Sequence, residues 1–413
     1  MIDLTQMGQQ AQAAAQVLAQ LDTATKNQAL QAMAAELTTH TEQILAANAR
    51  DLAAASNQPA KFTDRLRLTP ARITDMANGL TSVAALPDPT ARIDGGFTNA
   101  AGLSIIQKRV PLGVVGMIYE ARPNVTVDAA GLTLKSGNAV MLRGGKEALQ
   151  SNLALTQVLQ TALTKVGLPA QAVQLVADPS RALANEMMHL TAYLDVLIPR
   201  GGASLIQAVV NTATVPVIET GAGNCHIYVD QTADLAMAKA IVVNAKVQRP
   251  SVCNAAEKLL IHQAVAADYL PALAAALQAH GVALRGDEAA RAIVPNMAAA
   301  TAADWDTEYN DLIMAVKVVA DEDEAIAHIN RHNTKHSESI ITNDYASSER
   351  FLNQVDAACV YVNASTRFTD GEQFGFGAEI GISTQKLHAR GPMGLAALTT
   401  TKYQIRGNGQ VRE

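Results

Sequence analysis

Hydrophobic positions recur at helical spacing through the first hundred residues. Alanine-rich periodic stretches predict helices over Thr5–Leu21 and Ala24–Leu37. A third helix is expected after Thr39, because the spacing from Thr39 to Glu42 fits a capping box. The helical pattern ends before Asp94-Gly95-Gly96, which predicts a turn.

From about residue 103, short β-rich runs alternate with helix-length segments. Strands separated by such segments predict βαβ units and a parallel sheet that is covered on both faces. The predicted strands are Leu103–Val110, Val114–Ile118, Ala139–Leu142, Val173–Val176, Val196–Ile198, Pro216–Ile218 and Ile227–Val229, and the clearest helices are Ser151–Lys165 and Ala203–Asn211.

The alternation restarts after Asp230, which indicates a second αβ series. Its predicted helices are Leu235–Val243 and Ala264–Ala279, and its predicted strands are Leu259–Ile261, Ile313–Val319, Ser339–Ile341 and Val360–Val362. We therefore expect two lobes with a cleft between them. The last strand-like stretch, Leu398–Arg406, is followed by no helix and could extend the sheet of another subunit.

Composition narrows the classes of function. The 413 residues carry a net charge of −6, with 49% hydrophobic and 17% charged residues, which fits neither disorder nor nucleic-acid binding. No apolar run has the roughly 18 residues that a membrane span needs, and the first residues lack a signal-peptide pattern. The three cysteines form no C-x-x-C pair, so we expect neither a disulfide framework nor structural zinc, and a cytoplasmic location.

Two glycine-containing segments resemble nucleotide-binding fingerprints, and both fail. Gly221-Ala222-Gly223-Asn224-Cys225-His226 has a histidine in place of the third glycine, and Arg143-Gly144-Gly145-Lys146-Glu147 lacks the residues that flank a P-loop. The second segment still lies between a strand and a helix, where amides and a lysine can hold phosphate. A plain turn with exposed cations is the alternative. Arg200-Gly201-Gly202 leaves the same two interpretations open.

Cys253 has the sequence setting best suited to thiol chemistry. Cys359 lies in an apolar strand, and Cys225 lies in the glycine turn. Cys253 follows Arg249-Pro250-Ser251 at an irregular junction. Nearby cations or helix-end amides would raise its thiolate fraction, which is the nucleophilic form. Local context alone leaves a nucleophilic and a structural role open.

Three histidines recur every four residues and would line one helix face: His328, His332 and His336. A zinc site is one interpretation, but there is no H-E-x-x-H pattern and no cysteine nearby. A solvated face next to the acidic run Asp321–Glu324 is therefore the expectation, with no bound metal.

Several segments together resemble the aldehyde dehydrogenase superfamily. Glu219 precedes Cys253 by 34 residues, close to the spacing of that family's glutamate and catalytic cysteine. Longer segments narrow the resemblance to the branch that reduces L-glutamate 5-phosphate. The wider match rests on residues 110–116, Ser136-Gly137-Asn138, Glu219-Thr220-Gly221, Cys253 and Tyr361-Val362-Asn363, and the narrower one on residues 119–126, 198–202, 248–254, 374–384 and 386–392.

The resemblance implies an NADPH-dependent reduction of L-glutamate 5-phosphate to L-glutamate 5-semialdehyde and phosphate, in proline biosynthesis. An acyl phosphate has a good leaving group, so the Cys253 thiolate would form a thioester that accepts hydride. Glu219 would move a proton at the thiol. The oxyanion would be held by the Cys253 backbone N–H and by either Arg122 or Asn124, and this choice stays open.

The resemblance also implies the binding residues. Arg143 and Lys146 stand where many relatives carry Lys and Glu, and a cation there can pair with a 2′-phosphate, so NADPH is expected over NADH. The expected cofactor residues are Arg143, Gly144, Gly145, Lys146, Arg200, Gly201, Gly202 and Glu308. The expected anchors for substrate anions are Arg249, Arg367, His388 and Arg390.

The implied architecture is an α/β fold of the aldehyde dehydrogenase type. It comprises a Rossmann-like NADP-binding domain (1–230), a catalytic domain (231–385) and a small oligomerisation element formed by residues 97–111 and 386–413. A dimer or tetramer is expected, and transient contact with glutamate 5-kinase would suit a labile intermediate. An oxidising or CoA-dependent aldehyde dehydrogenase, or a non-catalytic binding protein of the same fold, stays open.

Overall fold

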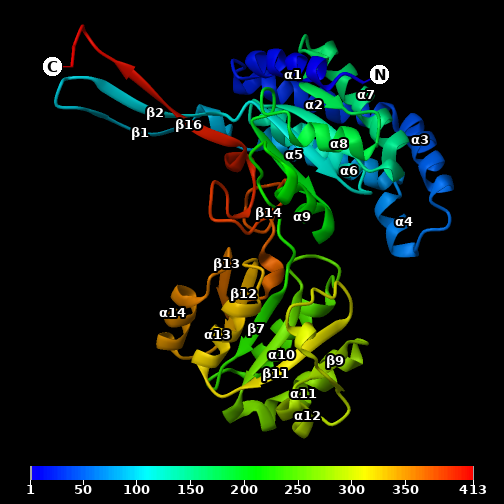
Figure 1. Cartoon of the computed structure of the whole chain (residues 1–413), viewed down its shortest axis with the longest axis vertical. Helices are drawn as coiled ribbons and strands as arrows, with labels where there is room; N and C mark the ends of the chain where they lie inside the picture. Colours follow the sequence, from blue (N-terminus) through cyan, green and yellow to red (C-terminus); the bar gives the residue numbers. More distant parts are fainter. Residues whose placement is uncertain (1, 413) are drawn as a thin grey trace. The chain divides into compact units, whose positions relative to one another are not determined.

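The computed structural model describes residues 2–412, which divide into two compact units (Figure 1). Unit 1 comprises Met1–Glu219, Gly375–Gly381 and Met393–Glu413. Unit 2 comprises Thr220–Phe374 and Ile382–Pro392. Both contain parallel sheets, as the alternation of strands and helices predicts.

Unit 1 is built around a four-stranded parallel sheet in the order β5-β4-β3-β6. All six residues of β3 are buried, because helices such as α1 and α6 pack against the sheet. The strands are β3 (Val114–Tyr119), β4 (Ala139–Gly144), β5 (Val173–Leu175) and β6 (Val196–Arg200); the helices are α1 (Leu4–Leu18), α2 (Thr23–Thr39), α3 (Thr41–Ala54), α4 (Ala60–Leu66), α5 (Pro70–Ala85), α6 (Asn124–Lys135), α7 (Leu149–Lys165), α8 (Arg181–Met188) and α9 (Ala203–Thr212).

Two local predictions in unit 1 are wrong. Thr39 is still the last residue of α2 and donates its hydroxyl to the Ala35 carbonyl, so it does not cap α3, whose N-cap is His40. The stretch Pro216–Ile218 is not a strand; Val217 makes only an isolated bridge to Leu197 of β6. Thr39 continues the preceding helix α2, and Val217 bridges to the neighbouring strand β6. Neither residue therefore belongs to the separate element that the sequence pattern predicts.

A second, antiparallel sheet in unit 1 has the order β1-β2-β16. The strands are β1 (Ile93–Thr98), β2 (Ser104–Pro111) and β16 (Thr399–Arg406). The pairing of the segment near residue 103 with the C-terminal strand is confirmed, whereas the predicted turn at Asp94-Gly95-Gly96 lies inside β1, where the register shifts. In Figure 1 this sheet extends away from the helices of unit 1, and apolar side chains such as Phe97 and Tyr403 are exposed.

Unit 2 contains a seven-stranded parallel sheet in the order β10-β9-β11-β8-β7-β12-β13. Helices α10 and α11 supply the core on one face, and α13 and α14 supply it on the other. The strands are β7 (Cys225–Val229), β8 (Ala256–His262), β9 (Ala283–Gly286), β10 (Ala298–Ala299), β11 (Ile313–Val319), β12 (Ser337–Ile341) and β13 (Cys359–Val362), with a separate pair β14 (Ile382–Ser383) and β15 (Gly391–Pro392); the helices are α10 (Leu235–Val247), α11 (Gln263–Ala279), α12 (Glu288–Ile293), α13 (Glu322–His332) and α14 (Tyr345–Gln354).

The strand predicted at Ile227–Val229 belongs to this second sheet. It lies within β7, between β8 and β12, so the expectation that it closes the first αβ series is wrong. Along the chain, the first boundary between the two compact units falls between Glu219 and Thr220. Within residues 2–412, no helix combines the length and apolar character that a bilayer crossing needs.

Candidate functional site

Cys253 lies on the turn between α10 and β8 of unit 2. The turn is closed by a bond from the Ala255 amide to the Val252 carbonyl, 3.0 Å long. Cys253 is partly exposed, whereas Cys225 and Cys359 are buried. None of the three forms a disulfide. A reagent in solvent therefore reaches Cys253 before the other two.

The backbone of Cys253 packs against the glycine-containing segment that precedes β7. The Cys225 Sγ donates to the Cys253 carbonyl oxygen at 3.2 Å. Burial is the main cause that raises the pKa of the Cys225 thiol far above its ordinary value, so this donor keeps its proton. Gly223 touches the Cys253 backbone directly.

Asn254, the next residue, ties the Cys253 turn to the segment around Arg367. Its Nδ2 donates to the Thr369 carbonyl at 2.8 Å, and its own carbonyl accepts from the Thr366 hydroxyl at 2.7 Å. Its Oδ1 accepts from Nη1 of Arg367. Three bonds therefore fix the direction in which the chain leaves Cys253.

Two of the expected substrate anchors lie next to the Cys253 turn: Arg249 is four residues before Cys253, and Arg367 bonds Asn254, the residue after it. Arg367 donates its Nε to the Gln248 side chain at 2.7 Å. Burial, followed by the charge of Arg249, lowers the pKa of the Arg367 guanidinium, and Cys253 also acts on it electrostatically. Two neighbouring cations favour an anion at this place.

The other two expected anchors lie on the segment that contains β14 and β15. Arg390 pairs with Asp356 at 2.7 Å, and Lys386 pairs with the same carboxylate at 3.0 Å. Hydrogen bonds from these two cations lower the pKa of Asp356 to about 2. His388 is exposed and has a positive φ of 63°. Arg390 is thus engaged in an ion pair, and a role in substrate binding stays a prediction for both residues.

The three histidines predicted to share a solvated helix face do not do so. His328 and His332 lie on α13 with their ring centroids 4.6 Å apart, but the helix ends at His332, so His336 precedes β12 and is buried. Burial, and then His332, lowers the pKa of His328 to about 4. Within residues 2–412, no set of three or more His, Cys, Asp or Glu side chains is placed to hold a metal ion.

The expected phosphate-binding turn of unit 1 follows β4. Arg143 donates Nη2 to the carbonyls of Pro179 and Ser180, so part of its guanidinium supports the loop after β5. Lys146 is exposed at the start of a 3₁₀ turn. The Nε of Arg143 and Oε2 of Glu147 are buried without a partner. Such atoms suit a polar ligand at this turn.

The amides at the start of α7 are not open to a phosphate. Asp51 of α3 accepts from the amides of Gln150 and Ser151 at 3.1 and 2.8 Å, and from the Ser151 hydroxyl at 2.6 Å. This carboxylate occupies the place where helix amides would hold an anion. Arg143 and Lys146, rather than the helix end, are the groups there that could pair with phosphate.

The second expected phosphate segment, Arg200-Gly201-Gly202, follows β6. The Gly202 amide donates to Oε2 of Glu120 at 2.9 Å, and the Arg200 carbonyl accepts from the Glu120 amide at 3.1 Å. A Cβ at Gly201 would lie 2.7 Å from that carboxylate oxygen. The Glu120 carboxylate therefore packs closely against Gly201, and a larger residue there would require this side chain to shift.

The expected oxyanion residues and Glu219 lie in unit 1 and Cys253 lies in unit 2. Asn124 begins α6 and donates Nδ2 to Asp128 at 2.9 Å, one turn along the helix. The carbonyl of Arg122 accepts from the Val125 amide at 3.0 Å. Asp128 thus fixes the orientation of the Asn124 amide.

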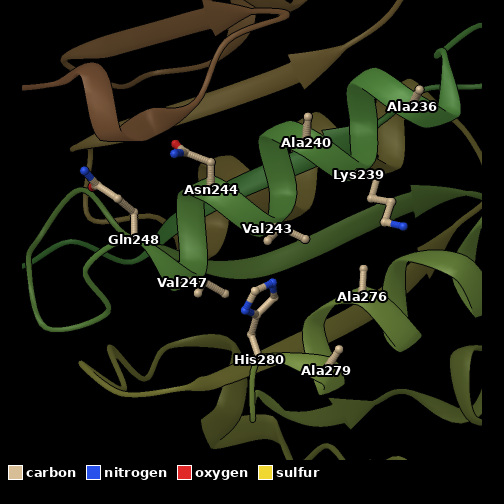
Figure 2. A pocket seen from close by; sticks show the side chains of 10 residues that line it. All are labelled: Ala236, Lys239, Ala240, Val243, Asn244, Val247, Gln248, Ala276, Ala279 and His280. Carbon is tan, nitrogen blue, oxygen red and sulfur yellow. The ribbon is translucent and has the colours of Figure 1, made fainter.

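A groove of about 750 Å³ lies on unit 2 between α10 and α11, and Figure 2 shows its lining. Small and apolar side chains dominate it, including Ala236, Ala240 and Val243. Gln248 at one end also bonds Arg367. Cys253 is not among the residues that line this groove.

Sequence reasoning missed several residues that hold Cys253, chiefly Gly223, Cys225 and Asn254. Their contacts come from segments far along the chain, which no local spacing reveals. One signal was present: a glycine pair that matches no nucleotide fingerprint indicates a close backbone approach.

Comparisons with known proteins agree with one another. The model of the aldehyde dehydrogenase family matches residues 2–309 and 305–402. A γ-glutamyl phosphate reductase of Lacticaseibacillus casei is 74% identical over 412 residues, covering 100% of this chain and 99% of the relative. The crystal structure of a γ-glutamyl phosphate reductase from Thermotoga maritima has a TM-score of 0.98 at 48% identity and covers 100% of both chains. An acetylating aldehyde dehydrogenase from Geobacillus thermoglucosidasius, 16% identical with a TM-score of 0.71 and 99% and 97% coverage, shares the fold.

Proposed function

The chain belongs to the aldehyde dehydrogenase family, and from this premise we propose that it acts as a γ-glutamyl phosphate reductase. In this activity L-glutamate 5-phosphate is reduced to L-glutamate 5-semialdehyde with release of phosphate, a step of proline biosynthesis. The protein is an oxidoreductase that uses a nicotinamide cofactor. The observation that carries the proposal is the partly exposed Cys253 thiol, with Arg249 four residues before it and Arg367 bonded to the side chain of Asn254, the residue after it.

The chemistry begins at the Cys253 sulfur. The thiolate attacks the carbonyl carbon of the acyl phosphate, the C–O bond to phosphate breaks, and phosphate leaves with its electron pair, which yields a thioester. When bound, the nicotinamide cofactor would supply the hydride for this carbon. The resulting thiohemiacetal releases the aldehyde as its oxygen loses a proton and the sulfur regains one.

The other residues hold charge around this centre. Arg249 and Arg367 supply positive charge for substrate anions. The Cys253 backbone N–H, with Arg122 or Asn124, would stabilise the oxyanion, and Glu219 would move the proton at the thiol.

NADPH is the cofactor that we propose. Lys146 is exposed three residues after Arg143, whose Nε is buried without a hydrogen-bond partner, and the positive charge of these two side chains can pair with a 2′-phosphate. The Lys146→Glu variant should raise the KM for NADPH far more than the KM for NADH, because only NADPH carries that phosphate. Steady-state kinetics with both cofactors measure this, and equal changes would contradict the assignment.

We further propose a homodimer or homotetramer that is formed through the β1-β2-β16 sheet. Four large apolar side chains on this sheet are each 58–61% exposed: Ile93, Phe97, Tyr403 and Ile405. A second subunit that packs against the sheet would bury them. Light scattering at micromolar concentration should give a dimer or tetramer, and Phe97→Glu should shift it toward monomer. A monomeric wild-type protein would contradict this.

The activity is tested in the oxidative direction. Glutamate 5-semialdehyde should reduce NADP only when inorganic phosphate is present, because phosphate must cleave the thioester. The Cys253→Ser variant is the matched control and should lose turnover. Phosphate-independent oxidation would indicate a hydrolytic aldehyde dehydrogenase, a requirement for CoA would indicate an acylating one, and either result overturns the proposal.

A further inference from the structure

Glu308 lies on the loop that joins the 3₁₀ turn Ala302–Trp305 to β11. Its Oε1 accepts from the Gly223 amide at 2.7 Å. The two residues are 85 positions apart in the chain. A carboxylate that accepts from an amide forms a charge-assisted bond, about twice as strong as a neutral one.

Gly223 is packed directly against the backbone of Cys253. A Cβ added to Gly223 would lie 1.4 Å from the Cys253 carbonyl oxygen and 2.7 Å from its Cα. The thiol of Cys225, the first residue of β7, donates to the same carbonyl at 3.2 Å. Any shift of the Gly223 backbone is therefore passed to Cys253.

Buried charges fix the ends of the loop that carries Glu308. Lys258 of β8 donates to the Thr307 carbonyl at 2.8 Å. Lys246 of α10 donates to the Asp311 carbonyl at 2.9 Å and pairs with Glu257 at 2.9 Å. Lys246 and Glu257 have no exposed side-chain area. Moving the loop would take the Thr307 carbonyl away from the buried Lys258 ammonium, which is costly.

The middle of the loop is held as well. The Lys258 Nζ lies 4.6 Å from the centre of the Tyr309 ring, in a cation–π contact. The Asn310 amide donates to Oε1 of Glu257 at 3.2 Å, and Asn310 has a left-handed φ of 54°. Glu308 is therefore presented to Gly223 by a loop with little freedom.

We propose that Glu308 is a positioning residue for Cys253, holding the Gly223 amide and thereby the thiol turn beside Arg249 and Arg367. This inference rests on the proposed function only in taking Cys253 as the nucleophile. In this role Glu308 holds the Gly223 amide, and with it Cys253, before cofactor or substrate binds.

The test measures how fast iodoacetamide alkylates Cys253 in the full chain, without cofactor or substrate. Mass spectrometry of the Cys253 peptide follows the reaction as a function of pH. In Glu308→Ala we expect the thiol to move away from Arg249 and Arg367. The pH at which the alkylation rate reaches half its maximum should therefore rise by about one unit, and the rate at pH 7 should fall about tenfold. In Glu308→Gln the side-chain oxygen still accepts from Gly223, so the rate should stay within about threefold of wild type.

The Gln variant separates the hydrogen bond from the charge. Both variants remove the negative charge, which by itself would speed alkylation. Wild-type rates in Glu308→Ala, or equal slowing in both variants, would overturn the proposal. Glu308→Asp withdraws the same charge by one methylene and should also slow alkylation, which keeps the test open if the alanine variant does not fold. Glu372→Ala, an exposed carboxylate of unit 2, is the matched control and should change nothing.

Kinetics distinguish this inference from the proposed function. Positioning predicts that kcat falls in Glu308→Ala and is restored in Glu308→Gln. A contact to cofactor alone predicts a rise in the cofactor KM with no change in alkylation, and that result overturns the inference. A failed phosphate-dependent assay together with the expected alkylation pattern would overturn the proposed function and leave the positioning role intact.

Discussion

Replacing Gly223 by alanine should displace the Cys253 backbone. The added Cβ would lie 1.4 Å from the Cys253 carbonyl oxygen, whereas ordinary van der Waals contact begins at 3.4 Å. The atom that would be struck is backbone, so no side-chain rotation relieves the overlap. Either Cys253 or the Gly223 segment must move by about 2 Å in total, as the difference between these two distances requires.

The size of the effect follows from this displacement. A misplacement of about 1 Å at a reacting group can lower the rate about 100-fold, so we expect kcat/KM to fall at least about 100-fold in Gly223→Ala. Overpacking costs about 1–3 kcal/mol. A domain with about 5–15 kcal/mol of stability therefore stays folded.

Two measurements check the reasoning. Phosphate-dependent NADP reduction gives kcat/KM, and urea unfolding followed by circular dichroism shows that the variant is folded. Gly79→Ala is the control, because a Cβ there meets nothing within 4 Å and the residue lies in α5. A folded Gly223→Ala protein with kcat/KM within about threefold of wild type would show that this contact does not set the thiol position.

Three further predictions concern stability. Lys246→Met leaves the buried Glu257 without its counter-ion, so the free energy of unfolding in urea should fall by about 3–5 kcal/mol, and a loss below about 1 kcal/mol would refute the role of the pair. Asp51→Ala removes the acceptor of the Gln150 and Ser151 amides and of the Ser151 hydroxyl proton and should cost about 2–3 kcal/mol in the same assay, where an unchanged value would count against the capping role. His328 has a folded pKa of about 4, below its unfolded value, so the folded state binds fewer protons and stability is lost as the pH falls from about 6.5 toward 4. The melting temperature of His328→Asn should therefore fall less steeply than that of wild type between pH 7 and pH 5, and calorimetry with parallel slopes would contradict this.

Hydrophobic patterning alone determined most elements and their type. The continuous apolar runs of β3 and β4 predict strands buried on both faces, which is how parallel sheets are built. Where the pattern failed, a neighbouring element decided: Thr39 stays in α2, and Val217 only touches β6. The placement of β7 in the second sheet depends on pairing with β8 and β12, and strand pairing is a long-range choice that hydrophobicity does not encode.

For the candidate site, the sequence by itself singled out Cys253 as the thiol to test, through the resemblance to a known family, and placed Arg249 near it in the chain. The tertiary structure alone decided what each charged group touches. Asp51 reaches the start of α7 from 100 residues away, and Glu308 reaches Gly223 across 85. Buried amides and cations must find an acceptor wherever the fold brings one, so these partnerships follow from three-dimensional packing and cannot be read from local spacing.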